Sequence, residues 1–161
     1  MSRKIKDKFK YFAVIYWIIG FEIISYSMGL ITRNNMDWYK LLNKSALTPP
    51  GYIFSVVWVM LYVTLAISSY LLYQKKEEAK IRQILFLFLL QMLCNWIWTP
   101  IFFGLHQIQI ALGILMLTIL LTAYIMMQSL KYYRIITYIL LPYFLWLLFA
   151  AYLNGMVYIL N

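Results

Sequence analysis

The chain has 161 residues, of which 65% are hydrophobic and 12% are charged, whereas a soluble domain is about half apolar and about a quarter charged. A water-soluble globule of this size could not bury so much apolar surface, which excludes the usual soluble enzyme folds, disordered chains and fibrous proteins. The single Cys excludes a disulfide framework and a cysteine-based zinc site. Because there is also only one His, we expect no metal site.

The formal net charge is +9, from 14 Lys and Arg against 5 Asp and Glu. In a soluble chain this excess would suggest nucleic acid, but the basic residues lie in short gaps between apolar runs and form no continuous stripe. This distribution is typical of membrane topology and of contact with anionic head groups. We therefore expect membrane lipid, and no nucleic acid, among the partners.

Five stretches are long and apolar enough for a transmembrane helix, which needs about 20 mostly apolar residues. They run over residues 11–32, 51–73, 83–104, 107–130 and 134–159. A β-barrel would show shorter segments of alternating hydrophobicity. The third and fourth stretches nearly touch, near Leu105–His106, and must form a tight hairpin. The predicted fold class is therefore an all-α membrane protein, a single five-helix transmembrane domain over residues 1–161 with a long loop at 33–50.

Basic residues are unevenly distributed between the two ends of these spans. The N-terminal tail carries five, the gap after the second span four and the gap after the fourth two, which makes eleven on one side. The other side has three, namely Arg33, Lys40 and Lys44. The positive-inside rule then places the N-terminus in the cytoplasm and the C-terminus outside. The expected location is a bacterial inner (plasma) membrane, with an organellar membrane as the alternative.

Aromatic residues make up 19% of the chain, and three predicted helices each carry a face that mixes aromatic, apolar and, on one of them, amide side chains. These faces comprise Phe54, Trp58 and Tyr62; Gln91, Asn95, Trp98 and Phe102; and Pro142, Trp146, Ala150 and Leu153. Polar side chains are costly in hydrocarbon unless they face protein or a cavity. The faces are expected to converge on the bundle interior, where a large, flat, mostly apolar ligand would fit. The alternative is that these stripes only pack the helices together.

Individual positions carry smaller predictions. Glu22 is the only acidic residue deep in a span, and is either a protonatable functional group, a neutral residue hydrogen-bonded to a neighbouring helix, or shallower than the span suggests. Thr48 is expected to cap the second helix, with Pro49 and Pro50 in its first turn. Cys94 is expected to be a small buried hydrophobe, and His106 a surface residue of the hairpin turn.

Three motifs occur in order between residues 38 and 154. They are Trp38-Tyr39 with Thr48-Pro49-Pro50, Phe54, Trp58 and Leu61-Tyr62; then Asn95-Trp96-Ile97-Trp98 with Phe102-Phe103; then Pro142-Tyr143-Phe144-Leu145-Trp146 with Phe149-Ala150 and Leu153-Asn154. Together they resemble the signature of the tryptophan-rich sensory protein / translocator protein family, also called TspO/MBR, which includes the peripheral-type benzodiazepine receptor. The chain departs from this pattern only around the loop, at Ser45, Leu47 and Tyr52.

The resemblance implies a five-helix bundle, usually a homodimer, with no obligatory cofactor. It implies binding of porphyrins (protoporphyrin IX or haem) and of benzodiazepine-type ligands in a pocket that opens toward the first loop. The residues expected to line this pocket are Tyr39, Trp58, Asn95, Trp98, Phe102, Trp146, Ala150 and Leu153. Cholesterol binding is not expected, because no Lys or Arg follows Tyr158 to complete the recognition pattern of animal members.

The function expected from this resemblance is that of a tetrapyrrole-binding membrane sensor or regulator. One alternative is a transporter of porphyrin or of another amphipathic compound. Another is an enzyme that degrades porphyrin in light. The sequence offers no nucleophile–base pair, metal cluster or phosphate-binding loop, so no catalytic residue is assigned and enzymatic activity stays open.

Overall fold

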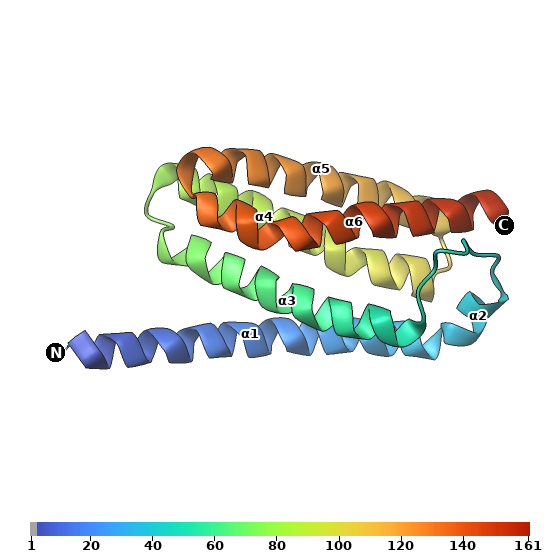
Figure 1. Ribbon diagram of the computed structural model, residues 1–161, viewed down its shortest axis with the longest axis horizontal. Coiled ribbons are helices and arrows are strands. Elements are labelled where there is room, and N and C mark those ends of the chain that lie inside the picture. The colour runs from blue at the N-terminus through green and yellow to red at the C-terminus, as the bar shows by residue number, and fades with distance from the viewer. Residues whose placement is uncertain (1–2) are drawn as a thin grey trace.

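The computed structural model describes residues 3–161, with side chains from Phe12 onward, and every regular element in this part of the chain is a helix. The elements are α1 (Arg3–Asn34), α2 (Met36–Leu41), α3 (Gly51–Gln74), α4 (Ala79–Thr99), the π-helical turn η1 (Pro100–Gly104), α5 (Ile108–Tyr132) and α6 (Arg134–Leu160). Figure 1 shows the five long helices side by side, with consecutive helices running in opposite directions along the long axis of the bundle.

The five predicted spans are confirmed. Phe12–Asn34, Gly51–Gln74, Ala79–Gly104, Ile108–Tyr132 and Arg134–Leu160 are long and apolar enough to cross a membrane, so the chain is an integral membrane protein. The third span begins at Ala79, whereas the sequence predicted residue 83. The additional first turn contains Lys80 and Arg82. It can be helical because the long side chains of these two residues reach the polar interface while the backbone continues the helix.

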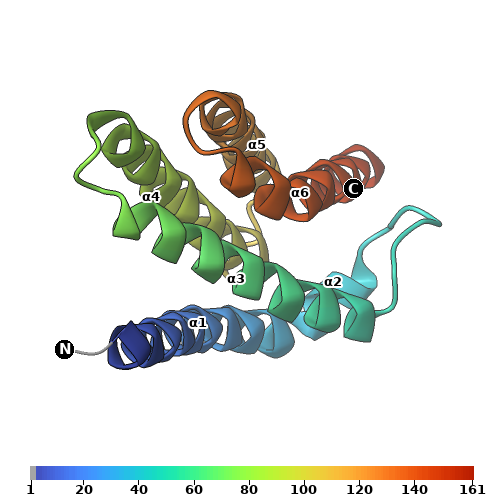
Figure 2. The ribbon, with the colours of Figure 1, turned by 60° about the vertical axis from the view of Figure 1, so that its left-hand side comes forward.

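The packing is uneven around the bundle. α5 packs against both α4 and α6, whereas α1 lies mainly along α3 (Figure 2). The two largest fully buried side chains are Tyr143 of α6 and Phe88 of α4, and α3 and α5 also contribute fully buried residues such as Leu65 and Ile125. By contrast, no described side chain of α1 is fully buried. α1 is therefore the helix whose described surface is most available to lipid or to another chain.

The first turn of α3 differs from the prediction that Thr48 caps it. The helix begins at Gly51, its N-cap position is Pro50 and no side chain caps it. Pro50 has φ −56° and ψ 148°, an extended conformation, and Pro49 is also biased away from helical angles because a proline follows it. Thr48 therefore lies too early to reach the first turn, and its N–H instead donates to the Ser45 carbonyl at 3.0 Å.

The predicted loop at 33–50 contains additional structure. α1 continues to Asn34 and the six-residue α2 follows, so apart from the turn residue Asn35 only residues 42–50 are irregular. We call residues 36–50 the cover segment. The Lys44 ammonium donates to the carbonyls of Tyr39 (2.8 Å) and Leu42 (2.6 Å), which places a cation at the C-terminal end of α2, where helix carbonyls lack partners.

The cover segment is also tied to the end of α6. The Asn43 N–H donates to the side-chain oxygen of Asn161 at 3.0 Å, and the Asn161 amide donates back to the Asn43 carbonyl at 3.0 Å. Ser45 and Tyr152 share a further hydrogen bond of 2.9 Å between their hydroxyl groups. These contacts hold residues that are more than 100 positions apart in the chain, so the cover segment is latched to α6.

The predicted hairpin between the third and fourth spans is confirmed and begins with a change of helix type. Pro100 has no N–H to continue the α-helical pattern, and the Leu105 N–H donates to the Pro100 carbonyl at 2.9 Å, five residues back. His106 follows in the left-handed region, with φ 57°. His106 is exposed as predicted, and its ring stacks on Trp38 of α2 at 4.0 Å between centroids.

Candidate ligand-binding site

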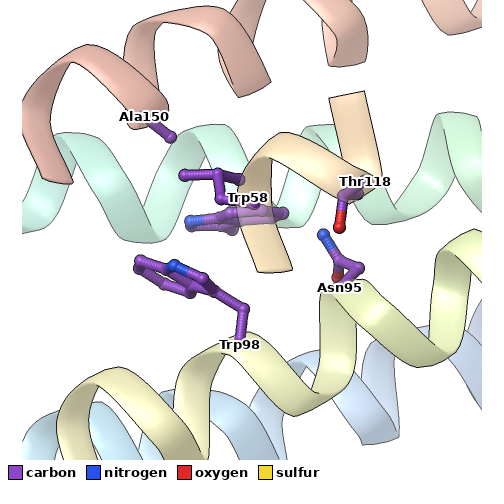
Figure 3. A pocket seen from close by; sticks show the side chains of 6 residues that line it. Trp58, Asn95, Trp98, Thr118 and Ala150 are labelled. Atoms are coloured by element: carbon purple, nitrogen blue, oxygen red, sulfur yellow. The ribbon is translucent and has the colours of Figure 1, made fainter. Parts of the chain in front are cut away.

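A cavity lies where four of the long helices meet. Trp58 of α3, Asn95 and Trp98 of α4, Leu115 and Thr118 of α5 and Ala150 of α6 line it (Figure 3). The cavity has a volume of about 10 Å³, which is room for about one water molecule. The walls are indole and aliphatic with a few polar atoms, which is the usual composition of a small-molecule site in a protein.

The size of the cavity limits what fits in this conformation. Pockets for drug-sized ligands usually measure about 300–1,000 Å³, whereas this cavity has a volume of about 10 Å³. A tetrapyrrole is at least drug-sized. Its rings therefore fit only if neighbouring elements move apart, although the chemistry of the walls is suitable.

Of the eight residues predicted to line a pocket, the structure brings four together at this cavity: Trp58, Asn95, Trp98 and Ala150. Tyr39 and Phe102 lie instead in an aromatic cluster between α2 and η1, with ring centroids 6.2 Å apart. Trp98 stacks on Phe102 at 5.1 Å. The cavity and this cluster are thus continuous through Trp98. Burial raises the pKa of Tyr39, which keeps its phenol neutral at physiological pH.

The other two predicted residues lie on α6, outside the cavity lining. Trp146 packs against Phe54 at 5.7 Å and Phe149 at 5.5 Å between ring centroids. Its indole nitrogen is buried and has no hydrogen-bond partner among the described residues. Leu153 is buried next to Asn154, whose side-chain oxygen accepts from the Trp98 indole at 3.3 Å.

Asn95 is held by a buried chain of hydrogen bonds behind the cavity. Its side-chain oxygen accepts from the Tyr62 hydroxyl at 3.2 Å, and its nitrogen donates to the Tyr143 hydroxyl at 3.0 Å. Tyr143 in turn donates to the Gln91 side-chain oxygen at 2.9 Å. Because both ends of the Asn95 amide have partners, the amide presents one defined orientation to the cavity.

Sequence reasoning missed the two lining residues on α5, Leu115 and Thr118. The predicted span over residues 107–130 is apolar all round, so no face stands out from its hydropathy. The available signal was the pair Thr118 and Thr122, four residues apart and hence on one face of the helix. Both hydroxyl groups donate to backbone carbonyls one turn back, at 2.8 Å and 2.7 Å.

Two residues singled out in the sequence do not line the cavity. Glu22 on α1 is half-buried, and its Oε1 atom is buried without a hydrogen-bond partner among the described residues. A hydrogen bond from a neighbouring helix to that oxygen is therefore not present. Cys94 is half-buried, so the prediction of a buried small hydrophobe was wrong. It precedes Asn95 and points to a different side of α4, where burial is less complete.

Comparisons with known proteins agree with this architecture. The model of the TspO/MBR family matches residues 12–160. The chain is 31% identical to the translocator protein of Sus scrofa, over 84% of this chain and 85% of the relative. It is also 31% identical to the tryptophan-rich protein TspO of Bacillus cereus, over 84% of this chain and 88% of the relative. Protein CrtK of Rhodobacter capsulatus is 31% identical, over 77% and 78% of the two chains. The chain belongs to the TspO/MBR family.

Proposed function

We propose that this protein is a membrane sensor or regulator of the translocator protein type that binds a tetrapyrrole between its helices. The observation that carries the proposal is the cavity, where Trp58 and Trp98 provide flat apolar surfaces and Asn95 and Thr118 provide polar groups. Indoles stack well on flat conjugated rings. Benzodiazepine-type ligands, which are also flat and mostly apolar, would use the same surfaces.

The proposed ligand contacts extend from the cavity along α4 toward the cover segment. Trp58, Asn95, Trp98 and Ala150 line the cavity already. Phe102 and Tyr39 continue the aromatic surface from Trp98, and Trp146 and Leu153 form the adjoining part of α6. We propose these eight as ligand contacts once the cavity opens. The cover segment is the element whose displacement would open it, since it carries Tyr39.

The chemistry of the lining favours a metal-free porphyrin such as protoporphyrin IX over haem. Proteins hold haem iron with His, Cys, Met or Tyr side chains. The six residues that line the cavity are Trp, Asn, Leu, Thr and Ala, and none of these types is an axial ligand. Of the eight proposed contacts, only Tyr39 has a side chain of a type that holds haem iron, and it lies in the aromatic cluster and not in the cavity lining.

A titration with protoporphyrin IX tests the proposal. The purified protein in detergent is expected to show saturable quenching of tryptophan fluorescence. Trp58→Phe keeps an aromatic ring but removes the indole N–H and part of the stacking area, so we expect it to weaken binding by about 0.5–2 kcal/mol, or about two- to thirtyfold. An unsaturable signal, or equal affinity in Trp58→Phe and wild type, would contradict the proposal.

Trp17→Phe is the matched control for this measurement. Trp17 packs against Tyr70 and Tyr73, with ring centroids 6.1 Å and 5.2 Å away, and it does not line the cavity. Its replacement is expected to change thermal stability without changing porphyrin affinity. If it weakens binding as much as Trp58→Phe, the site is assigned to the wrong place.

Two alternative activities of the same site are separable by experiment. A transporter would carry porphyrin into sealed vesicles, whereas a sensor would only bind it. An enzyme would form products from protoporphyrin IX in light, and Trp58 and Trp98 are the indoles placed to take part. Binding without uptake and without products supports the sensor.

We also propose that the protein forms a homodimer in a bacterial inner membrane. Ser25 and Gly29 of α1 form a small-x-x-x-small pattern, which is common where membrane helices pair. Gly29 is exposed, and nothing lies within 4 Å of the position where a Cβ would be. Cross-linking of the protein in native membranes, with Gly29→Leu as the disrupting variant, tests this assembly.

A further inference from the structure

Basic side chains at one end of the bundle form a surface that plays no part in the cavity. The α3–α4 and α5–α6 connections lie at the same end of the molecule (Figure 1 and Figure 2). Lys75 of the first connection reaches Tyr133 of the second, with its Nζ atom 4.3 Å from the ring centroid. The two connections therefore form one surface, and we call residues 75–82 and 131–134 together the basic patch.

The basic patch has a surplus of positive charge. It contains six Lys and Arg residues and two acidic residues, Glu77 and Glu78. Among the described residues, its one ion pair joins the Lys75 ammonium to the Glu78 carboxylate at 3.8 Å, which is longer than a hydrogen bond. Five of the six basic residues are exposed, and Lys76 is half-buried. Most of this charge is therefore available to an anion from outside the chain.

The basic residues at the opposite end of the bundle are fewer and are already engaged. The Lys40 ammonium pairs with the Asp37 carboxylate at 2.9 Å. The Lys44 ammonium donates to three backbone carbonyls, at 2.6 to 3.3 Å. The two ends thus differ in how much of their positive charge is available, as well as in the number of basic residues.

Tyrosine rings fix the depth of the ammonium groups in the basic patch. The Nζ atom of Lys76 lies 4.0 Å from the ring centroid of Tyr73, and that of Lys131 lies 5.4 Å from the ring centroid of Tyr132. Both rings stand at or next to the last residue of a span, where tyrosines contact the membrane–water interface. A cation–π contact occupies one side of an ammonium group and leaves N–H groups that can donate elsewhere. These cations therefore lie at the depth of lipid head groups.

Arg134 adds a planar donor to the same surface. Its Nε atom donates to the Leu130 carbonyl at 3.2 Å, which holds the guanidinium against the end of α5. Within the described part of the chain, no acceptor occupies its terminal nitrogens. A guanidinium can bind a phosphate through two parallel N–H···O bonds. The basic patch thus combines a fork for phosphate oxygens with several point charges.

We propose that the basic patch binds the head group of an anionic phospholipid, such as phosphatidylglycerol. The phosphate oxygens accept hydrogen bonds from the Lys and Arg side chains. A zwitterionic phospholipid carries the same phosphate, but its own ammonium group cancels the charge and is repelled by the surplus of cations. A lipid is favoured over a soluble anion because the tyrosines hold the cations where the phosphates of a bilayer lie. The inference does not depend on the cavity or on its ligand.

Fluorescence anisotropy of phosphatidylglycerol, labelled at the end of one acyl chain, tests this inference. The purified protein is titrated at a fixed concentration of non-ionic detergent, where its orientation in a membrane plays no part, and unlabelled lipids compete. We expect saturable binding, with phosphatidylcholine competing roughly tenfold less well. Lys75→Gln combined with Lys131→Gln removes two of the six positive charges, so the affinity is expected to fall about five- to thirtyfold.

Two further variants and a salt series are the controls. Lys75→Arg combined with Lys131→Arg keeps both charges and should retain the affinity. Arg33→Gln combined with Lys40→Gln removes two exposed charges at the opposite end and should also leave it unchanged. Raising the ionic strength from about 0.1 M to about 1 M shortens the screening length from about 10 Å to about 3 Å, and should weaken binding to the wild type without any substitution.

Four results would overturn the inference. Equal competition by phosphatidylglycerol and phosphatidylcholine would mean that only the acyl chains bind, and an unchanged affinity in the Lys75 and Lys131 glutamine variant would mean that the patch makes no contact. Equal losses in the two glutamine variants would mean that the net charge of the protein attracts the lipid. Displacement by glycerol phosphate as readily as by the lipid would mean that the patch binds a soluble anion.

Discussion

The indole N–H of Trp146 is buried and has no hydrogen-bond partner within the described part of the chain, whereas the Trp98 indole N–H donates to Asn154 at 3.3 Å. An unpaired buried donor costs about 1–3 kcal/mol, so Trp146 contributes less to stability than its size suggests. A side chain in this state is suited to a ligand that supplies the missing acceptor. This contrast separates a residue that holds the fold from one that is available for binding.

Trp146→Phe tests this distinction. The change removes the unpaired N–H, which offsets the packing that the smaller ring loses, so Tm is expected to stay close to that of the wild type. Porphyrin affinity is expected to fall by about 0.5–2 kcal/mol, since the donor and part of the stacking area are gone. Thermal unfolding and porphyrin titration of the same preparation measure both. A fall in Tm with unchanged affinity would assign Trp146 to packing alone.

Tyr143 is the opposite case, because its hydroxyl is fully used. It is 0% exposed, accepts from Asn95 and donates to Gln91. Tyr143→Phe takes a partner from both Asn95 and Gln91, and leaves the Gln91 oxygen only the 3.4 Å bond from Thr122. It is expected to lower the free energy of unfolding by about 1–3 kcal/mol. Tyr138→Phe, on the same helix but 63% exposed, is the control. Equal denaturation midpoints for the two variants would show that the buried chain does not stabilise the bundle.

At the scale of single residues, the site could be predicted where polar or aromatic side chains recur on one face. Trp58, Asn95, Trp98 and Ala150 were named from spacing and family motifs, and the structure places them at one cavity. Thr118 was not found, because a lone hydroxyl in an apolar span has little effect on hydropathy and its own helix carbonyl already satisfies its hydrogen. Its role depends on which helix faces it, which the sequence does not state.

At the scale of elements, apolar length predicted the five long helices and missed the short one. α2 has six residues, which is below the length at which helical periodicity can be recognised. It persists because Trp38 and Tyr39 pack on Phe102 and because Lys44 binds the carbonyls at its end. The start of α3 at residue 51 is confirmed, but the cap was wrongly assigned to Thr48, because capping by Thr48 competes with the conformation that two consecutive prolines impose.

The latch between Asn43 and Asn161 is expected to control access to the cavity. Asn161→Ala removes both hydrogen bonds between the Asn161 side chain and the Asn43 backbone, each 3.0 Å long. Because each of the two hydrogen bonds contributes about 0.5–1.5 kcal/mol, the open population should rise about five- to 150-fold. Limited proteolysis should then cut the cover segment faster, and bound porphyrin should slow the cutting.

Two observations would contradict this account of the cover segment. Equal cleavage with and without porphyrin would mean that the segment does not respond to the ligand. Equal cleavage of Asn161→Ala and wild type would mean that the latch does not hold it. Asn34→Ala, at the exposed end of α1, is the matched control and should leave cleavage of residues 42–50 unchanged.

At the scale of the whole molecule, the helices gather basic residues at one end of the bundle. Figure 1 shows the N-terminal end of α1 at the same end as the α3–α4 and α5–α6 connections, with the cover segment, the α4–α5 turn and the C-terminus at the other. Lys75 also lies over the ring of Tyr133, 4.3 Å from its centroid, which joins the two connections. Eleven Lys and Arg residues belong to the first end and three to the second.

This asymmetry predicts the orientation in the membrane. Basic residues near span ends are retained on the cytoplasmic side, so the N-terminus is expected in the cytoplasm and the cover segment, with the cavity beneath it, on the outer side. Fusions of a reporter that is active only in the cytoplasm should be active at the N-terminus and inactive at the C-terminus. Replacing Lys75, Lys76, Lys80 and Arg82 by Gln should weaken this preference, whereas replacing the exposed Gln107 and Gln109 by Asn should not. If this reporter were active at the C-terminus and inactive at the N-terminus, the orientation would be the reverse. The ligand would then have to reach the cavity from inside the cell.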